Sequence, residues 1–109
     1  MIQQMIEQQF DEMVAIRRHL HMYPELSFQE VETPKYIANY HRKLGLDVRE
    51  QVGGRGVVAT LRGSKPGKTV AIRADFDALP IQEENDVAYK SKNDGVMHAC
   101  GHDAHTAML

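Results

Sequence analysis

The predicted architecture depends on one segment, KTVAIRADFDALP, which spans residues 68–80. The apolar run Val70–Ile72 within it is nearly continuous, as expected of a strand that is covered on both faces. Working outward, the sequence has three β-type runs separated by glycine-rich turns, at 47–52, 57–61 and 68–75. We therefore expect a small, mainly antiparallel sheet in which the third strand is central.

Helical patterns lie on either side of these runs. Apolar residues recur every three or four positions from Ile2 to Leu20, which predicts an amphipathic helix that ends before Pro24. The last residues, from His102 to Leu109, resemble the first two turns of another helix and end while still apolar. We expect that the chain is the amino-terminal piece of a longer protein.

A second helix is predicted between the first helix and the sheet. Ser27 and Glu30 have the spacing of a capping box, and Gly45 is a typical C-terminal stop. Pro34 favours a start just after Thr33, because proline fits the first turn of a helix and disrupts its interior. The predicted fold class is α/β, with two helices packed on the small sheet.

Composition sets limits on the protein class. The 109 residues are 42% hydrophobic and 26% charged, which is typical of one globular domain. The formal net charge of −2 gives no attraction to nucleic acid or to an anionic membrane. No apolar run reaches bilayer length, and the first residues lack a basic segment followed by an apolar one. We expect no nucleic-acid or membrane partner and a cytoplasmic location.

The densest group of reactive side chains is MHACGHDAHT, residues 97–106. Cys100 and His102 flank Gly101, which permits a sharp turn that aims sulfur and imidazole at one point. This donor pair suits zinc first, and also cobalt, nickel or manganese. Two ligands do not complete a site, so further ligands must come from elsewhere.

Each residue of this group also has a simpler interpretation. Cys100 is the one cysteine, and a free cysteine is often a small buried hydrophobe or a redox thiol. His105 lies three positions after His102 on the same helical face, where it is either a further ligand or a residue bonded to a nearby carboxylate or carbonyl. His98 is a weaker ligand candidate.

Two carboxylates follow the expected central strand. Asp75 and Asp77 point to the same side of an extended chain, because side chains alternate along a strand. They are placed to ligate a cation or to hold a ligand histidine by its second nitrogen. In the alternative interpretation, one carboxylate caps a turn and the other pairs with Arg73.

Taken together, three segments resemble the amino-terminal part of the M20 metallopeptidase family, and most of all its amidohydrolase branch, which includes N-acyl-amino-acid, hippurate and auxin-conjugate hydrolases. The segments are residues 17–30, 73–81 and 97–106. The resemblance implies that residues 1–109 form the amino-terminal part of a zinc-exopeptidase-like catalytic domain, without the family's separate lid domain.

The same resemblance implies roles for four residues. Cys100 and His102 match ligands of a centre with one or two ions, commonly zinc or manganese. Asp77 matches the acidic residue that orients a metal-bound histidine, and Asp75 falls where many family members carry that histidine. Asp77 and Asp75 are therefore the predicted catalytic carboxylates.

The implied reaction is metal-dependent hydrolysis of the amide bond of a small N-acyl amino acid or related amine, by a protein that is a homodimer at full length. In the family a Glu-Glu pair and two further histidines complete the site, and we expect them outside this chain. We therefore expect the chain alone to bind metal weakly and to hydrolyse nothing measurable. The alternatives are a carboxypeptidase or dipeptidase of the same family, and a non-enzymatic metal-binding module.

Overall fold

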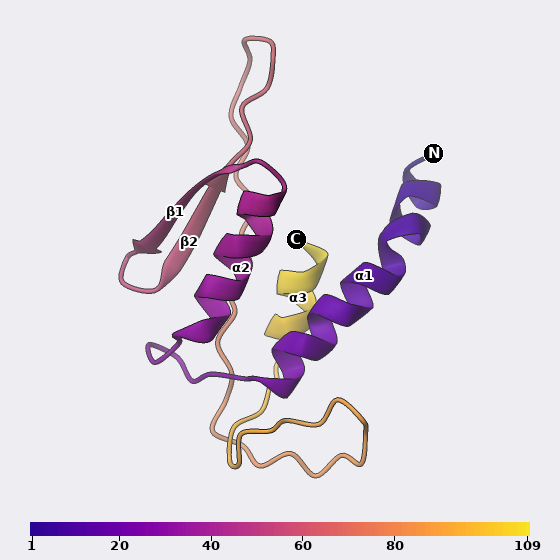
Figure 1. The fold of residues 1–109 in the computed structure, drawn as a ribbon, viewed down its shortest axis with the longest axis vertical. Helices are drawn as coiled ribbons and strands as arrows, with labels where there is room; N and C mark the ends of the chain where they lie inside the picture. Colours follow the sequence, from indigo (N-terminus) through magenta and orange to yellow (C-terminus); the bar gives the residue numbers. More distant parts are fainter.

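The computed structural model describes all 109 residues, which form three helices and one two-stranded sheet (Figure 1). Helix α3 lies beside α1, whereas α2 packs on the hairpin formed by β1 and β2. The α/β class is confirmed. The bounds of the elements are Ile2–Met22 for α1, Glu32–Lys43 for α2, Asp47–Val52 for β1, Gly56–Thr60 for β2 and His102–Met108 for α3.

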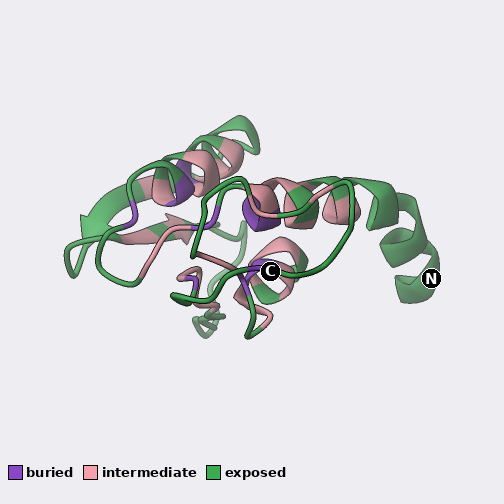
Figure 2. Ribbon diagram, turned by 90° about the horizontal axis from the view of Figure 1, so that it is seen from below, coloured by how far each residue is buried: buried purple, intermediate pink, exposed green.

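Helix α1 forms where the apolar periodicity predicts it, and it extends to Met22. Its amino-terminal half projects away from the rest of the chain and is exposed, including Ile2, Ile6 and Phe10 (Figure 2). Its carboxy-terminal end is the anchored part, where Leu20 and His21 are buried. The buried end of α1 therefore faces the segment that carries the predicted metal ligands.

Helix α2 begins at Glu32, two residues before the start expected from Pro34. The proline lies in the first turn as expected, at the third helical position, where its missing N–H costs no helical hydrogen bond. The capping-box interpretation of Ser27 and Glu30 is wrong, because the helix starts beyond both residues and has no side-chain cap from its own N-cap residue.

The amino end of α2 is held instead by Glu25, a residue outside the helix. Its carboxylate accepts hydrogen bonds from the backbone N–H groups of Val31, Glu32 and Thr33 at 2.8, 3.1 and 2.6 Å. Burial alone would raise the pKa of Glu25, but these hydrogen bonds outweigh burial and lower the pKa. Glu25 thus satisfies N–H groups that the first turn of a helix leaves unpaired.

Strands β1 and β2 pair in antiparallel register, with Asp47 opposite Thr60 and Arg49 opposite Val58. A bulge interrupts the ladder between Arg49 and Val52. The glycines at 53 and 54 adopt positive φ angles of 64° and 106° in the connecting turn, which confirms the prediction of a hairpin there.

The predicted third strand at 68–75 is wrong. No strand pairs with this segment, and the sheet contains only β1 and β2. Val70 and Ile72 remain 83% and 76% exposed, so their apolarity does not reflect cover by the two helices. A run of β-forming residues becomes a strand only when another strand satisfies its backbone groups.

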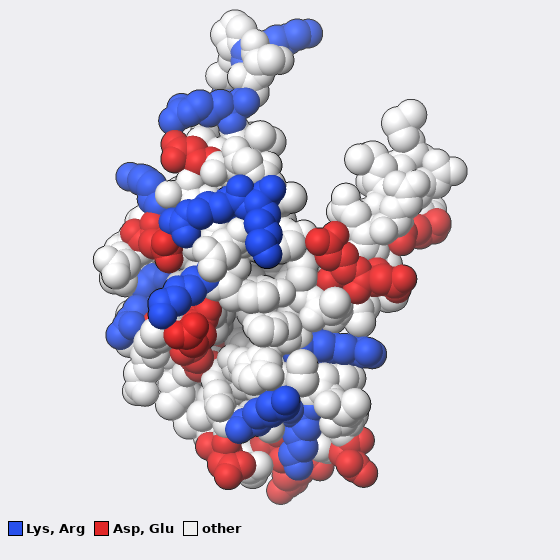
Figure 3. Space-filling view, in the orientation of Figure 1, with Lys and Arg blue, Asp and Glu red and all other residues white.

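Charged side chains of both signs are interspersed over α2 and the hairpin on the face shown in Figure 3. Many of these groups pair at the surface, as Arg42 does with Glu50 and Lys35 with Glu32. None of the helices combines the length and the apolar character needed to cross a bilayer.

Candidate metal centre

The turn that joins Cys100 to His102 has the geometry that its glycine permits. Gly101 precedes α3 with φ 99° and ψ 10°, in the left-handed region. The thiol of Cys100 is free and exposed, and His102 is the first residue of α3. The chain therefore places a solvent-accessible sulfur two positions from an imidazole at the start of a short helix.

The imidazole of His102 is held by Asp77, a residue 25 positions earlier in the sequence. Its Nδ1 atom lies 2.8 Å from Oδ1 of Asp77 and 3.1 Å from the backbone oxygen of the same residue. Both partners are acceptors, so Nδ1 carries the hydrogen and donates. In the neutral ring, Nε2 then keeps its lone pair, and it makes no hydrogen bond within the chain. This is the tautomer that binds a metal ion through Nε2.

Asp75 makes a different set of contacts. Its carboxylate pairs with Arg73, as the simpler interpretation of this carboxylate expects. Its backbone oxygen accepts a hydrogen bond of 2.8 Å from the hydroxyl of Thr106 on α3. The segment that contains Asp75 and Asp77 is therefore attached to α3 at two points, through His102 and through Thr106.

The other two histidines of the 97–106 segment lie in contrasting environments. The His105 ring is exposed, with its centroid 6.4 Å from that of His102. His98 is 5% exposed, neither of its ring nitrogens has a hydrogen-bond partner, and burial lowers its pKa. No three side chains of His, Cys, Asp or Glu lie close enough together to hold a metal ion. Cys100 and His102 thus fit two ligands of a centre that needs further donors.

A buried ionic cluster lies directly behind this turn. The Nδ1 atom of His21 is 2.8 Å from Oδ2 of Asp103, and its Nε2 atom is 3.0 Å from Oε2 of Glu83. Arg17 donates from Nε to the same oxygen of Asp103 at 2.9 Å. We call these four residues, Arg17, His21, Glu83 and Asp103, the His21 cluster.

Three members of the His21 cluster are almost free of solvent contact, whereas the side chain of Arg17 is 35% exposed. His21 is 3% exposed, Glu83 is 2% and Asp103 is 1%. Residue types and spacing in the sequence single out neither His21 nor Glu83 as a site residue. No sequence pattern connects residues that lie 62 and 82 positions apart. Only the folded chain brings them together.

The environment of Glu83 favours its ionised form. Burial alone would raise the pKa of Glu83, but hydrogen bonds from His21, from the backbone N–H of Ser91 and from the side chain of Asn85 outweigh burial. They lower the pKa of Glu83 to about 2. The carboxylate is therefore charged across the physiological pH range.

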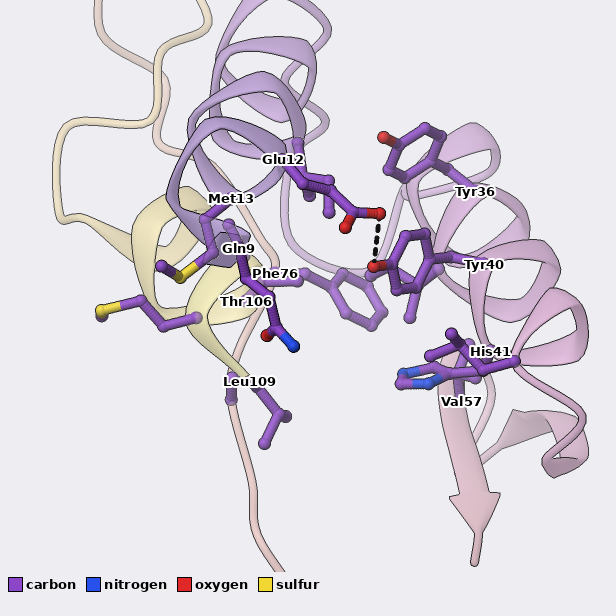
Figure 4. A pocket seen from close by; sticks show the side chains of 16 residues that line it. Gln9, Glu12, Met13, Tyr36, Tyr40, His41, Val57, Phe76, Thr106 and Leu109 are labelled. Atoms are coloured by element: carbon purple, nitrogen blue, oxygen red, sulfur yellow. Dashed lines mark hydrogen bonds between the residues drawn. The ribbon is translucent and has the colours of Figure 1, made fainter. Parts of the chain in front are cut away.

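A cavity of about 370 Å³ opens between α1, α2 and α3 (Figure 4). Most of its lining is apolar, and the hydroxyl of Tyr40 donates a 2.9 Å hydrogen bond to Glu12 across it. Cys100, His102 and Asp77 do not line this cavity. This apolar cavity and the predicted metal ligands are therefore separate features.

Comparison with known families and proteins gives consistent matches. The profile of the family described as Peptidase family M20/M25/M40 matches residues 71–109, which include Asp75, Asp77, Cys100 and His102. A protein of Bacillus subtilis (strain 168) that is provisionally named an amidohydrolase is 68% identical over 92% of this chain. The N-acyl-L-amino acid amidohydrolase of Geobacillus stearothermophilus is 50% identical over 99% of the chain.

Thermostable carboxypeptidase 1 of Saccharolobus solfataricus is 59% identical over 91% of the chain. Among solved structures, a Bacillus subtilis protein described as a dinuclear metal binding peptidase from the M20 family superposes with a TM-score of 0.84 at 48% identity over 89% of this chain. The match covers 28% of that protein. The chain spans about a quarter of the length of the curated relatives, from 25% to 29%.

Proposed function

Because this chain belongs to the peptidase family M20/M25/M40, we propose that it supplies Cys100 and His102 as ligands to the metal centre of an amidohydrolase that removes the acyl group from a small N-acyl amino acid. The name of the Geobacillus relative supports this substrate class. The proposal assigns residues 1–109 to part of a catalytic domain, in agreement with the fraction of its relatives that the chain covers.

The observation that carries the proposal is the contact between His102 and Asp77. Because the Asp77 carboxylate accepts the hydrogen bond from Nδ1, Nε2 is the ring nitrogen whose lone pair is free to bind a metal ion. The same contact fixes the orientation of the ring. Cys100, whose thiol is exposed, is two positions away in the sequence.

The donor set indicates zinc or manganese. Thiolate and imidazole suit zinc in particular, and manganese agrees better with oxygen donors contributed by other residues. When bound, the ion supplies Lewis-acid activation of the amide carbonyl and of the attacking water. Within this chain, Asp77 orients His102, and Asp75 holds α3 through its backbone oxygen and Thr106. A dinuclear centre is part of the proposal, by analogy with the matched Bacillus structure.

A chimaeric enzyme tests this function. Residues 1–109 replace the matching part of the Geobacillus N-acyl-L-amino acid amidohydrolase, to which they are 50% identical. We expect hydrolysis of N-acetyl amino acids, and its loss together with metal content in the Cys100→Ser and His102→Gln chimaeras. Tyr40→Phe, which removes a hydrogen bond that involves neither ligand, is the control and should retain activity. Full activity and metal content in the Cys100→Ser chimaera would contradict the proposal.

A carboxypeptidase is the second candidate function, favoured by the 59% identity to the Saccharolobus carboxypeptidase. Both candidates use the same two ligands. They differ in the group on the carbonyl side of the scissile amide bond, which is a simple acyl group in one case and an aminoacyl group in the other. Steady-state kinetics of the complete gene product on N-acetyl amino acids and on dipeptides separates them. A higher kcat/KM for dipeptides would select the carboxypeptidase.

A further inference from the structure

We propose that the His21 cluster is a positioning device, which fixes the rotation of α3 and thereby the direction of the His102 ring. The inference rests on the proposed role of His102 as a metal ligand. It concerns residues that do not touch the metal: Arg17 and His21 on α1, Glu83 in the loop, and Asp103 on α3.

The first step is the position of Asp103, which directly follows His102. Its Oδ2 atom accepts from both His21 and Arg17, and its Oδ1 atom accepts from the backbone N–H of Ala104 at 2.9 Å. Successive side chains of an α-helix are separated by about 100° around the axis. Fixing the direction of Asp103 against α1 therefore fixes the direction in which the neighbouring His102 leaves the helix.

The second step is that α3 is too short to hold itself. It has 7 residues, and a helix of this length is not stable without tertiary contacts. It is also attached to the segment around Asp75 and Asp77, through Thr106 and the ring of His102. Asp77 thus holds the ring itself, and the His21 cluster holds the helix that carries the ring.

The third step is the pairing of the buried carboxylates. The two ring nitrogens of His21 face oxygens of Glu83 and Asp103, and Arg17 also donates to Asp103. Buried charges are tolerated only in such paired arrangements, and removing one member leaves its partner uncompensated. The cluster therefore has one favourable geometry, which joins α1, α3 and the loop.

The loop that contributes Glu83 is also attached to the end of α1. The backbone N–H of Lys92 donates to the carbonyl of Met22 at 2.9 Å, and the side chain of Asn93 donates to the carbonyl of Pro24 at 2.7 Å. These bonds hold the loop over His21. A change at Glu83 should therefore act on His21, its partner in the cluster, and through His21 on Asp103.

The test compares Asp103→Ala, Asp103→Asn and Glu83→Gln with the unaltered 109-residue chain. Tyr40→Phe is the control for general destabilisation, since it loses a hydrogen bond between α1 and α2 that involves neither the ligands nor the His21 cluster. Long-range 1H–15N spectra of the metal-free chains report the Nδ1–H bond of His102. Titration with Co2+ reports affinity through the thiolate-to-cobalt absorption.

In Asp103→Ala we expect the single ordered signal of the His102 ring to disappear. We also expect the Co2+ affinity to fall about tenfold, the lower end of the usual loss of affinity when a residue that supports a ligand is removed. Asp103→Asn keeps one acceptor oxygen but loses the charge, so it should lose less of both than Asp103→Ala, and Glu83→Gln should also show a smaller loss. Tyr40→Phe should show neither change. A folded Asp103→Ala chain with unaltered ring signals and affinity would overturn the inference.

If Asp103→Ala does not fold, the isosteric Glu83→Gln variant decides the question by the same two measurements, and unaltered values in that variant would overturn the inference. Failure of the proposed function looks different. In that case the unaltered chain shows no thiolate-to-cobalt absorption, while the metal-free ring spectra still support or overturn the role of the cluster.

Discussion

Oδ1 of Asp77 lies 2.8 Å from Nδ1 of His102, and this contact joins the end of an extended segment to the first residue of α3. It sets the tautomer of the histidine, and through the tautomer it leaves Nε2 available to a metal ion. The remaining features of the site act on the two elements that this contact joins.

Removing the carboxylate should weaken metal binding without abolishing the fold. For Asp77→Ala we expect the zinc affinity of the chain, measured by isothermal titration calorimetry, to fall about 10- to 100-fold, as is usual when a ligand histidine loses its carboxylate partner. Asp47→Ala removes a carboxylate that pairs with Arg62 at the surface and should bind zinc like the unaltered chain. Equal affinities for all three chains would show that Asp77 does not prepare His102.

Gly101→Ala should both destabilise the chain and impair the site. Space is available for the added methyl group, but the φ angle of 99° is unfavourable for any residue with a Cβ atom. We expect a loss of about 1–2 kcal/mol in the free energy of unfolding, measured with urea. The matched change Gly67→Ala, at a glycine without positive φ or close neighbours, should stay within about 0.5 kcal/mol of the unaltered chain. Losses of the same size at both glycines would contradict the strained-turn argument.

The free energy of unfolding should also depend on Glu25. Glu25→Ala removes the acceptor for three N–H groups at the start of α2 and should cost about 1 kcal/mol, as for other lost helix caps. Glu84→Ala provides the comparison, because that side chain is exposed and should change stability by less than about 0.5 kcal/mol. The idea fails if urea unfolding gives the same value for both variants.

The pKa of Glu83 predicts a pH dependence of stability with a defined sign. The folded-state pKa of about 2 lies below the ordinary value of 4.5, so ionised Glu83 stabilises the fold above pH 4.5. This contribution should disappear as the pH falls from 4.5 towards 2. The difference in unfolding free energy between the unaltered chain and Glu83→Gln isolates it from the other carboxylates and should shrink over that interval. A difference that stays constant from pH 6 to pH 2 would contradict the assignment.

Local signals in the sequence predict the elements that depend on local interactions. The periodicity of α1, the place of Pro34 in the first turn of α2 and the glycine turn of the hairpin all correspond to the structure. The third strand does not, because Val70 and Ile72 match the composition of a buried strand but have no strand to pair with. Pairing is a property of two segments and cannot be read from one.

The same distinction applies to the candidate site. Residue types and spacing identify Cys100 and His102 as ligand candidates, and they identify Asp77 as a carboxylate that could hold a histidine. The contacts of His21 with Glu83 and Asp103 join three distant parts of the chain and are visible only after folding. Likewise, no local pattern indicates that Glu25 caps a helix that starts 7 residues later.

The central claim is that Cys100 and His102 bind the same metal ion, and X-ray absorption spectroscopy of the zinc-loaded chain tests it most directly. We predict one sulfur at about 2.3 Å and nitrogen at about 2.0–2.1 Å from zinc. In Cys100→Ser the sulfur shell should disappear, and in His102→Gln the multiple-scattering signal of the imidazole should weaken. A zinc environment of oxygen and nitrogen alone, identical in the unaltered chain and in Cys100→Ser, would contradict the account.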